Sequence, residues 1–359
     1  MSRPTIKDVA LRAGVTFQTV SRALNGTGEI SESTRRRVRR AAEELNYRPS
    51  LLARSLRQQR TATIGLIVWS FDVAVLPLIV KGVHDAARAS DYDLLFANVE
   101  DLREERRYLN LLYSKHVDGI IVISKSLLDV DNDHIRGLDG LPCVLVNRGV
   151  PEPTVDSIHW DNEAGAYRAT SYVIALGHRR IAYVSGSEDR RASHEELTGY
   201  RRAMQQAGLD NHVQPGASES ELAGRHAAEA LLALQPRPTA IIADDDTIAI
   251  GVLAAARQFG LVVPDDLAVV GQDDTILAAH SAPPLTSVTL PTGETGTESV
   301  RLLLEQINGS RTEPVHLVLP RDLLVRESCG GGPRQDHERG KKTKCERSSS
   351  DSIAATHRP

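Results

Sequence analysis

Apolar residues with helical spacing open the chain and predict two short helices. Their apolar stripes flank a turn at Gly14 and consist of Ile6, Val9 and Ala10, then Val20, Ala23 and Leu24. Thr5 and Thr16 each stand where a side-chain oxygen can accept a free backbone N–H of the first helical turn. Helices this short are not stable alone. The pattern therefore predicts that they pack on each other and on a third helix.

The third helix is predicted from Ser31 to Leu45. Ser31 can cap its start, and Asn46 can end it before Pro49 prevents any continuation. Its inward-facing residues are Val38, Ala41, Ala42 and Leu45. Three such helices form a helix-turn-helix head, whose second helix enters the major groove of DNA.

Charge supports a nucleic-acid partner for this head. Residues 1–60 contain thirteen lysines and arginines and five acids, a net charge of +8, whereas the whole chain carries −4 and the remainder therefore −12. This asymmetry suggests that the head alone meets a polyanion. The run from Arg35 to Arg40 by itself fits a solvated basic helix equally well. Combined with the helix-turn-helix pattern, it favours DNA.

From Ile64 onward, strand-like apolar runs alternate with helical stretches. The predicted strands are Ile64–Trp69, Asp93–Ala97, Gly119–Ile123, Cys143–Val146, Ile181–Val184, Ala240–Ala243, Leu267–Val270 and Val315–Leu319. The predicted helices include Leu76–Ala89, Glu104–Lys115, Asn162–Leu176, His194–Ala207, Glu219–Leu234 and Thr247–Phe259. This alternation implies parallel sheets with right-handed crossovers. The roughly eight to ten units exceed one compact sheet and predict two α/β lobes, with ligands at the carboxyl ends of the strands.

Two further segments differ from both regions. Ser50–Leu56 has one short helical pattern, and a helix of this length with nothing to bury against is expected to be mostly disordered when free. Gly330–Pro359 is polar, basic and nearly free of large apolar residues, so disorder is expected there as well. An inert tail is the preferred interpretation of that segment, and a nonspecific DNA contact is the alternative.

Composition excludes several classes of protein. A chain of 359 residues with 41% hydrophobic and 25% charged residues is typical of a globular protein with a large core. Cys143, Cys329 and Cys345 show no metal-ligand spacing and no disulfide framework, which fits a reducing cytosol. The chain shows no apolar signal core and no run of about eighteen apolar residues, so a cytoplasmic protein is expected.

The head resembles that of the LacI/GalR family of bacterial transcriptional regulators. The matching segments, in the family's order and spacing, are Thr5–Ala10, Ala13–Val15, Thr19–Arg22, Leu24-Asn25, Ile30-Ser31, Thr34-Arg35, Leu45–Pro49 and Ala53–Leu56. The resemblance extends from about Thr5 to about Ser328. It implies an all-α helix-turn-helix head plus an α/β two-lobed, periplasmic-binding-protein-like domain with parallel sheets flanked by helices.

The domain boundaries follow from these segments. Residues 1–49 are assigned to the DNA-binding head and 50–60 to a hinge helix and linker. Residues 61–328 are assigned to a two-lobed effector-binding and dimerisation domain, in which the resemblance implies three connections between the lobes. Residues 329–359 are assigned to a disordered tail.

Three residues of the second helix are expected to read bases. Gln18 can pair with adenine, Phe17 can contact a thymine methyl group, and Arg22 can bind a guanine edge. The alternatives are a core position for Phe17 and a solvated charge for Arg22. The resemblance further implies phosphate contacts, which suit short hydroxyl and amide groups, at Thr5, Thr16, Thr19, Ser21, Asn25 and Thr34.

The hinge residues are also implied by the resemblance. Leu56 would wedge between base pairs from the minor groove and kink the duplex. Ala53, one turn earlier, is small enough to let the hinge helix sit deep in that groove. The alternative is that Leu51, Leu52 and Leu56 cover the surface of a lobe.

The effector site is implied by the resemblance at five positions, and one of them departs from the family. These positions are Asn147, Trp160, Glu196, Asp245 and Asp273. Family members commonly carry arginines at the positions of His194 and Glu196. A carboxylate at Glu196 turns a donor into an acceptor, so an acidic cleft for a neutral polyol or a cation is expected. The equal alternative is that Glu196 turns to solvent and the site is rebuilt elsewhere. Trp69–Asp72 departs from the family as well.

An enzyme is the first rival interpretation. The run Asp244–Asp246 and the pair Asp273-Asp274 could suggest metal or acid–base chemistry, but helix capping by Asp246 and Asp274 is the preferred interpretation. No phosphate-binding glycine loop, nucleophile elbow or zinc-protease motif occurs. A solute receptor and a DNA-architectural protein are the other rivals, disfavoured by the basic head and by the two lobes respectively.

The predicted protein is therefore a homodimeric transcriptional regulator without enzymatic activity, cofactor or metal. It would bind a near-palindromic double-stranded operator, and a small molecule, a sugar or related polar metabolite, would control that binding. A repressor is expected, with an activator or dual regulator of the same family as the alternative.

Overall fold

The computed structural model describes residues 4–26, 28–47, 60–69, 74–123, 140–148, 155–187, 190–216 and 218–331. The predicted hinge residues Ala53 and Leu56, Cys345 and the predicted tail beyond residue 331 lie outside these residues. Cys329, which the sequence assigns to the tail, is buried, and its Sγ lies 3.1 Å from Thr286 Oγ1.

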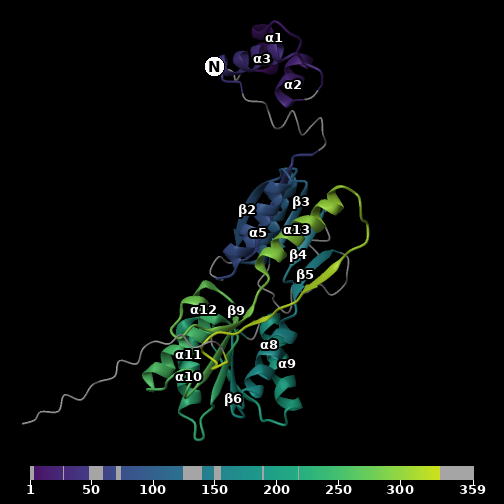
Figure 1. Ribbon diagram of the computed structural model, residues 1–359. Coiled ribbons are helices and arrows are strands. Elements are labelled where there is room, and N and C mark those ends of the chain that lie inside the picture. The colour runs from purple at the N-terminus through teal and green to yellow at the C-terminus, as the bar shows by residue number, and fades with distance from the viewer. Residues whose placement is uncertain are drawn as a thin grey trace, which may run out of the picture.

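The head consists of the three predicted helices, α1 (Ile6–Ala13), α2 (Phe17–Asn25) and α3 (Glu32–Glu44) (Figure 1). Thr16 and Ser31 cap α2 and α3, since their hydroxyl oxygens accept the backbone N–H groups of Thr19 and Thr34. Gly14 ends α1 with a φ of 61°, which glycine adopts without steric cost. The two apolar stripes meet the inner face of α3 in one core, formed by Val9, Ala10, Ala13, Val20, Ala23, Val38, Ala41 and Ala42.

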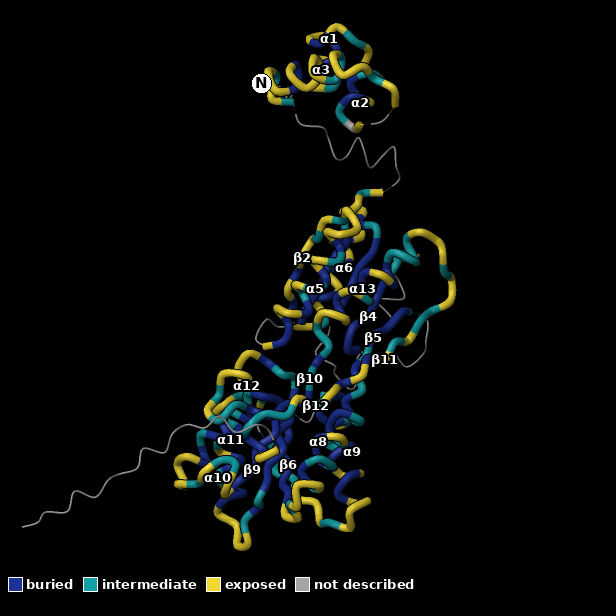
Figure 2. The backbone as a smooth tube through the Cα atoms, viewed as in Figure 1, coloured by how far each residue is buried: buried dark blue, intermediate teal, exposed yellow. Residues whose placement is uncertain are grey.

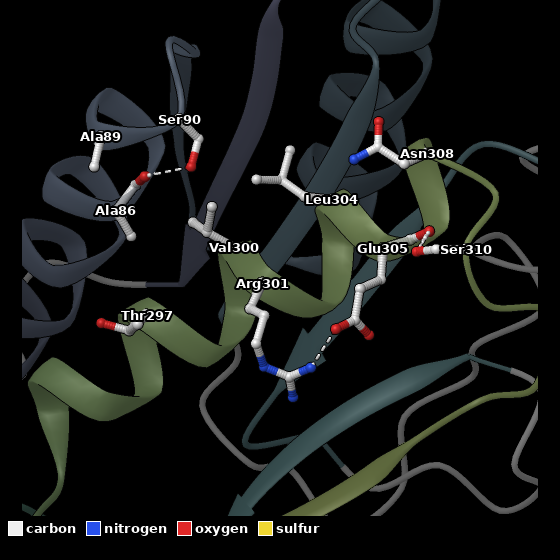
Figure 3. Close-up of a pocket in the computed structure, with 10 residues that line it drawn as sticks. All are labelled: Ala86, Ala89, Ser90, Thr297, Val300, Arg301, Leu304, Glu305, Asn308 and Ser310. Carbon is white, nitrogen blue, oxygen red and sulfur yellow. Dashed lines mark hydrogen bonds and ion pairs between the residues drawn. The ribbon is translucent and has the colours of Figure 1, made fainter.

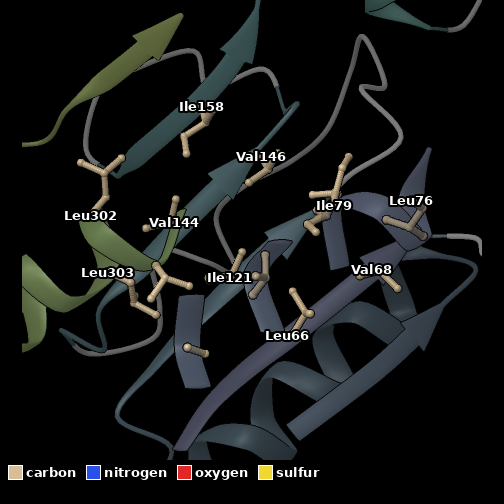
Figure 4. Packing of buried hydrophobic residues seen from close by; sticks show 14 of the residues in the cluster. Leu66, Val68, Leu76, Ile79, Ile121, Val144, Val146, Ile158, Leu302 and Leu303 are labelled. Carbon is tan, nitrogen blue, oxygen red and sulfur yellow. The ribbon is translucent and has the colours of Figure 1, made fainter. Parts of the chain in front are cut away.

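The first lobe, which we call the N-lobe, is built on a parallel sheet of six strands. In chain order these are β1 (Thr63–Trp69), β2 (Asp93–Val99), β3 (Gly119–Ile123), β4 (Cys143–Val146), β5 (Asp156–Trp160) and β11 (His316–Leu319), and their spatial order is β11-β5-β4-β3-β1-β2. Helices α5 (Leu76–Ala89) and α13 (Thr292–Ile307) cover one face, where their leucine, isoleucine and valine side chains pack on the strands (Figure 4). Helix α6 (Leu102–Ser114) covers the other face.

The second lobe, the C-lobe, repeats this plan. Its strands are β6 (Ile181–Ser185), β7 (His212–Pro215), β8 (Ala240–Ala243), β9 (Ala268–Asp273), β10 (Thr286–Thr289) and β12 (Leu323–Leu324), in the order β12-β10-β9-β8-β6-β7. Among the described strands of this sheet, β12 pairs antiparallel with β10 and the others pair in parallel. Helices α10 (Glu221–Leu232), α11 (Asp246–Gln258) and α12 (Ile276–His280) pack on one face, and α8 (Asn162–Ala175) and α9 (Arg191–Gln206) on the other.

The chain passes between the lobes three times. The first crossover joins β5 to α8, the second joins β10 to α13, and the third joins β11 to β12. Because β5, β10 and β11 all end at these crossovers, the carboxyl ends of both parallel sheets face the boundary between the lobes (Figure 1). Figure 2 shows the buried strands inside each lobe and the exposed helix faces outside.

Arg60 attaches the start of the N-lobe to the end of α13. Its Nη1 donates to Asn308 Oδ1 and its Nη2 to the carbonyl oxygen of Ile307, both at 2.8 Å. Helix α13 therefore runs from the second crossover to the residue at which the linker from the head arrives. Among the described residues, no helix is long and apolar enough to cross a lipid bilayer.

Candidate functional site

The predicted base-reading residues lie on the open face of α2. Val20 and Ala23 face the core of the head, whereas Phe17, Gln18 and Arg22 are exposed. Phe17 is 55% exposed, which excludes the alternative that it is a core residue. Three side chains of suitable donor, acceptor and apolar character thus project from one helix into solvent.

The predicted phosphate contacts surround that helix. Thr5 and Thr16 are exposed, and Thr19, Ser21 and Thr34 are half-buried. The hydroxyl of Thr16 lies 3.0 Å from that of Thr19, and Ser31 Oγ donates to Thr34 Oγ1 at 2.9 Å. Hydroxyl groups therefore stand at the N-termini of both α2 and α3, where free backbone N–H groups favour anions. Asn25 is the last residue of α2.

The basic run on α3 is partly neutralised. Arg40 Nε lies 3.0 Å from Glu44 Oε1, Arg12 Nη2 lies 2.7 Å from Glu44 Oε2, and Arg36 Nε lies 3.6 Å from Glu32 Oε1. Hydrogen bonds from Arg12 and Arg40 lower the pKa of Glu44. These exposed pairs stabilise the head only weakly.

The predicted effector residues, which we call the interlobe site, fall into two groups. Asn147 and Trp160 follow or end the neighbouring strands β4 and β5 of the N-lobe, and Asn147 N donates to Ile158 O at 2.8 Å. Trp160 is only 7% exposed, and its Nε1 donates to Thr295 Oγ1 of α13 at 2.9 Å. Most of Trp160 therefore belongs to the N-lobe core, and little of its surface is left for a ligand.

The C-lobe supplies the three acids of the interlobe site. Glu196 lies on α9, Asp245 precedes α11, and Asp273 ends β9 with a φ of 93°. Glu196 and Asp273 are brought together by Arg321, whose Nη1 and Nη2 donate to Glu196 Oε1 at 2.6 Å and to Asp273 Oδ1 at 2.8 Å. Arg321 was not among the predicted site residues.

The structure corrects the expectation of an acidic cleft and the expectation that Glu196 turns to solvent. Glu196 does not turn to solvent, because it is only 3% exposed. The site is not simply acidic either, because Arg321 pairs with two of its carboxylates and Arg190, paired with Glu219, lies 4.0 Å from Asp244. The arginine that is missing from α9 is replaced by one from the third crossover. No local pattern in the sequence marks Arg321, since its partners lie 48 and 125 residues away.

The three consecutive acids Asp244–Asp246 serve three different purposes. Asp244 accepts hydrogen bonds from Tyr183 Oη at 2.7 Å and Ser193 Oγ at 2.6 Å. Asp245 caps α11 by accepting the N–H of Ile248 at 2.7 Å. Asp246 accepts the N–H and hydroxyl of Thr275 and the hydroxyl of Ser287. Their oxygens thus point to separate partners rather than to one metal-sized point.

The helix caps differ by one residue from the expected ones. Asp245, not Asp246, is the N-cap of α11, and Thr275, not Asp274, is the N-cap of α12. Asp274 instead accepts Arg326 Nη2 at 2.5 Å. Where the structure describes the chain, no group of three histidines, cysteines or acids is arranged to hold a metal ion.

Burial perturbs these carboxyl groups strongly. It raises the pKa of Asp245 to about 8, against the N–H of Ile248, which lowers it. Burial also raises the pKa of Asp246 to about 7. For Glu196, burial and the charge of Asp244 raise the pKa, and Arg321 opposes both. Burial therefore makes uncompensated negative charge costly at these positions.

The N-lobe wall that departs from the family is held by a buried network. Trp69 ends β1 and donates its Nε1 to Glu105, whose two oxygens accept Arg148 Nη1 at 2.8 Å. Glu105 and Arg148 are completely buried. Phe71 and Asp72 lie outside the described residues.

A separate pocket of about 390 Å³ lies in the N-lobe between α5 and α13 (Figure 3). Its lining is mainly apolar or small, and Arg301 is paired with Glu298 and Glu305. It lies away from the carboxyl ends of the strands and contains none of the interlobe residues.

Comparison with known proteins identifies the family. A family model for bacterial regulatory proteins of the lacI family matches residues 5–50, and one for a periplasmic binding protein-like domain matches residues 170–329. The chain is 39% identical over 337 residues to the HTH-type transcriptional regulator CelR of Thermobifida fusca, an alignment that covers 91% of this chain and 98% of that protein. The chain belongs to the lacI family.

Other similar proteins are transcriptional regulators as well. The HTH-type transcriptional repressor PurR of Vibrio campbellii is 36% identical over 328 residues, covering 90% of this chain and 98% of that protein. A solved CelR–cellobiose complex shares 38% identity with a TM-score of 0.68, covering 91% of this chain and all of that one. A Lac repressor dimer bound to operator and the anti-inducer ONPF shares 26% identity with a TM-score of 0.82, covering 91% and 99%.

The predicted family, fold class and general function are thereby confirmed. This lacI-family member is a DNA-binding transcriptional regulator that is controlled by a small molecule. The roles of individual residues and the domain boundaries stay predictions.

Proposed function

We propose that this regulator is a homodimeric repressor in the cytoplasm, which a neutral polyhydroxylated compound releases from or fixes to its operator. It acts by binding alone, without a catalytic step. One observation carries the proposal. The chain combines a face of α2 whose exposed side chains suit contacts with DNA bases with two sheets whose carboxyl ends meet at a network of buried charges.

Two copies of α2 would enter successive half-sites of a near-palindromic operator. Phe17, Gln18 and Arg22 would read base edges, because their exposed side chains provide an apolar surface, a bidentate amide and a guanidinium. The hydroxyl and amide residues around them would fix the register through phosphates. These are Thr5, Thr16, Thr19, Ser21, Asn25 and Thr34.

The hinge would act between the two heads. Leu56 would insert into the minor groove, with the small Ala53 allowing close approach. The attachment of Arg60 to α13 gives this segment a fixed starting point on the N-lobe. A change in the N-lobe would therefore reach the hinge through a short chain of contacts.

The ligand would be a sugar or related neutral polyol. Glu196 and Asp273 share the positive charge of Arg321, so this arginine is not free to pair with a phosphate or carboxylate of the ligand. Carboxylate oxygens accept hydrogen bonds from hydroxyl groups, which sugars supply. The CelR relative, whose solved complex contains cellobiose, is consistent with this class.

The decisive experiment is selection of operator sequences from random DNA with the full chain, followed by gel-shift titration with and without cellobiose, ribose and glucose 6-phosphate. We expect one palindromic site and an affinity change of about 1–3 kcal/mol on ligand binding. Binding without sequence preference would refute the regulator, and a transcription assay on the selected site distinguishes repression from activation.

Two substitutions test the DNA contacts. Arg22→Ala should relax specificity at one base pair by about 1–3 kcal/mol, whereas Arg40→Ala, which removes the same charge from α3, should not change specificity. Leu56→Ala should weaken specific binding and reduce DNA bending, measured by circular permutation of the site. Unchanged bending would remove the wedge role.

A further inference from the structure

One buried guanidinium touches all three connections between the lobes. Arg321 lies in the third crossover and is 1% exposed. Its Nε donates at 3.2 Å to the carbonyl oxygen of Thr289, where the second crossover begins. Its Nη1 donates at 2.6 Å to Oδ1 of Asn162, where the first crossover ends. The three chain segments about which the lobes would move are therefore fixed to one side chain.

The same guanidinium holds two acids of the interlobe site. Nη1 also donates to Glu196 Oε1 at 2.6 Å, and Nη2 donates to Asp273 Oδ1 at 2.8 Å. A planar guanidinium carries five donors in a rigid fork, so it can serve several acceptors in fixed directions. The crossovers and these two acids consequently cannot be rearranged independently.

We propose that Arg321 is the positioning residue of the ligand site: it orients Glu196 and Asp273 for ligand hydroxyl groups and couples them to all three crossovers. The proposal rests on the ligand class given above and deepens it, because it names the residue that passes ligand contacts on to the hinge. Arg321 itself acts through the two carboxylates and does not touch the ligand.

The free acceptor atoms support this role. Arg321 occupies one oxygen of each carboxylate, and neither Glu196 Oε2 nor Asp273 Oδ2 accepts a hydrogen bond from a residue that the structure describes. Each acid thus keeps one oxygen, held in a set direction, for a hydroxyl donor. An anionic ligand would add negative charge beside two carboxylates whose cation is already bound.

Arg326 provides a matched control in the same segment. It is also an arginine paired with an aspartate, since its Nη2 lies 2.5 Å from Asp274 Oδ1, and its Nη1 donates to the carbonyl oxygen of Leu285 at 2.7 Å. Both partners belong to the C-lobe, so Arg326 contacts no crossover through these bonds.

The test compares Arg321→Lys with Arg326→Lys in the full chain by hydrogen–deuterium exchange. A lysine keeps the charge but has one donor group, so it cannot reach all the acceptors. We expect amide exchange in residues 160–163, 288–292 and 319–323 to accelerate together by about ten- to a hundredfold, the effect of losing hydrogen bonds to a charged group. Arg326→Lys should leave these segments unchanged. Acceleration in residues 319–323 alone would overturn the proposal.

A second variant guards against misfolding. Arg321→Gln combined with Glu196→Gln removes the cation and the more deeply buried of its two carboxylates together, so only the half-buried Asp273 loses its charged partner. It should show the same joint acceleration in the three crossovers, because the fork is lost, and protection equal to wild type would contradict the coupling.

The ligand arm tests the proposed function separately. Cellobiose should bind wild type and Arg326→Lys alike by calorimetry and Arg321→Lys about tenfold more weakly, while glucose 6-phosphate should not bind. Preferential binding of glucose 6-phosphate to wild type would refute the ligand class, whatever the exchange data show. Equal binding of cellobiose to Arg321→Lys and wild type would overturn the positioning role.

Discussion

Replacing Asp245 by asparagine isolates the effect of one buried carboxyl group. Asp245 is buried, and its Oδ1 accepts the N–H of Ile248 at 2.7 Å as the N-cap of α11. Asparagine caps a helix about as well as aspartate, so the hydrogen bond and the shape are kept. Only the ability to ionise is lost.

The expected magnitude follows from the pKa of Asp245, which burial raises from 3.8 to about 8. Between these two pKa values, Asp245 holds a proton in the folded state that it has released in the unfolded state. The free energy of unfolding therefore falls as the pH rises from about 4 to about 8. Each pH unit costs up to about 1.4 kcal/mol, so between pH 5 and pH 7 the wild type should lose up to about 2.7 kcal/mol relative to Asp245→Asn.

Urea unfolding of both proteins at pH 5, 6, 7 and 8, followed by circular dichroism, measures the difference. Asp101→Asn makes the same change at the exposed N-cap of α6, where Asp101 Oδ1 accepts the N–H of Glu104 at 2.8 Å, and so separates burial from loss of an aspartate cap. Parallel stability curves for wild type and Asp245→Asn would refute the reasoning, because the buried carboxyl would then ionise without cost.

Three other substitutions test packing, polarity and coupling. Gly296→Ala would put a Cβ 2.4 Å from the backbone carbonyl carbon of Gly82 on α5, so it should lower the unfolding free energy by about 1–3 kcal/mol. Gly293→Ala on the same helix has open space around its Cβ and should change the unfolding free energy by less than about 1 kcal/mol. Equal effects of the two substitutions in thermal melts would contradict the close contact. Gln272→Leu removes a buried side-chain amide whose oxygen and nitrogen have no hydrogen-bond partner among the described residues. The substitution should raise the unfolding free energy by about 1–3 kcal/mol in urea titrations. A decrease would mean that an ordered water or another group binds the Gln272 amide. Arg60→Ala removes the hydrogen bonds to the end of α13, so it should reduce the ligand-induced change in operator affinity, which is typically about 1–3 kcal/mol, as measured by gel shifts. Ligand affinity, measured by calorimetry, should not change. An unchanged operator response would exclude the contact between Arg60 and α13 from the coupling between ligand and DNA binding.

The head was predictable because its determinants are local. The caps at Thr16 and Ser31, the turn at Gly14 and the apolar stripes each act within a few residues, and the structure has all of them. The buried strands were predictable for a similar reason, since continuous apolar runs such as Gly119–Ile123 mark strands covered on both faces.

Other elements carry weaker local signals. Strand β5 contains Asp156, Ser157 and His159, and strand β10 contains two threonines and a serine, so neither has an apolar run. Helix α13 begins with Thr292-Gly293-Glu294-Thr295-Gly296, which is poor in helix-forming residues, because Gly296 is needed for the close approach to α5. Packing with distant residues decides these elements.

The charges of the interlobe site were predicted only in part. Resemblance located Glu196, Asp245 and Asp273, but their charge state depends on Arg321 and on burial. A contact between residues far apart in the chain leaves no periodic mark in the sequence. The environment of Glu196 therefore required the three-dimensional arrangement.

The separation between head and lobes has a practical consequence for engineering. The core of the head is made only of residues between Ile6 and Tyr47, and Arg60 is the first described residue after the linker, already bonded to α13. A chimera joined just before Arg60 would keep that bond while exchanging the entire DNA-binding module. Such a junction would let this ligand-binding domain control a different operator.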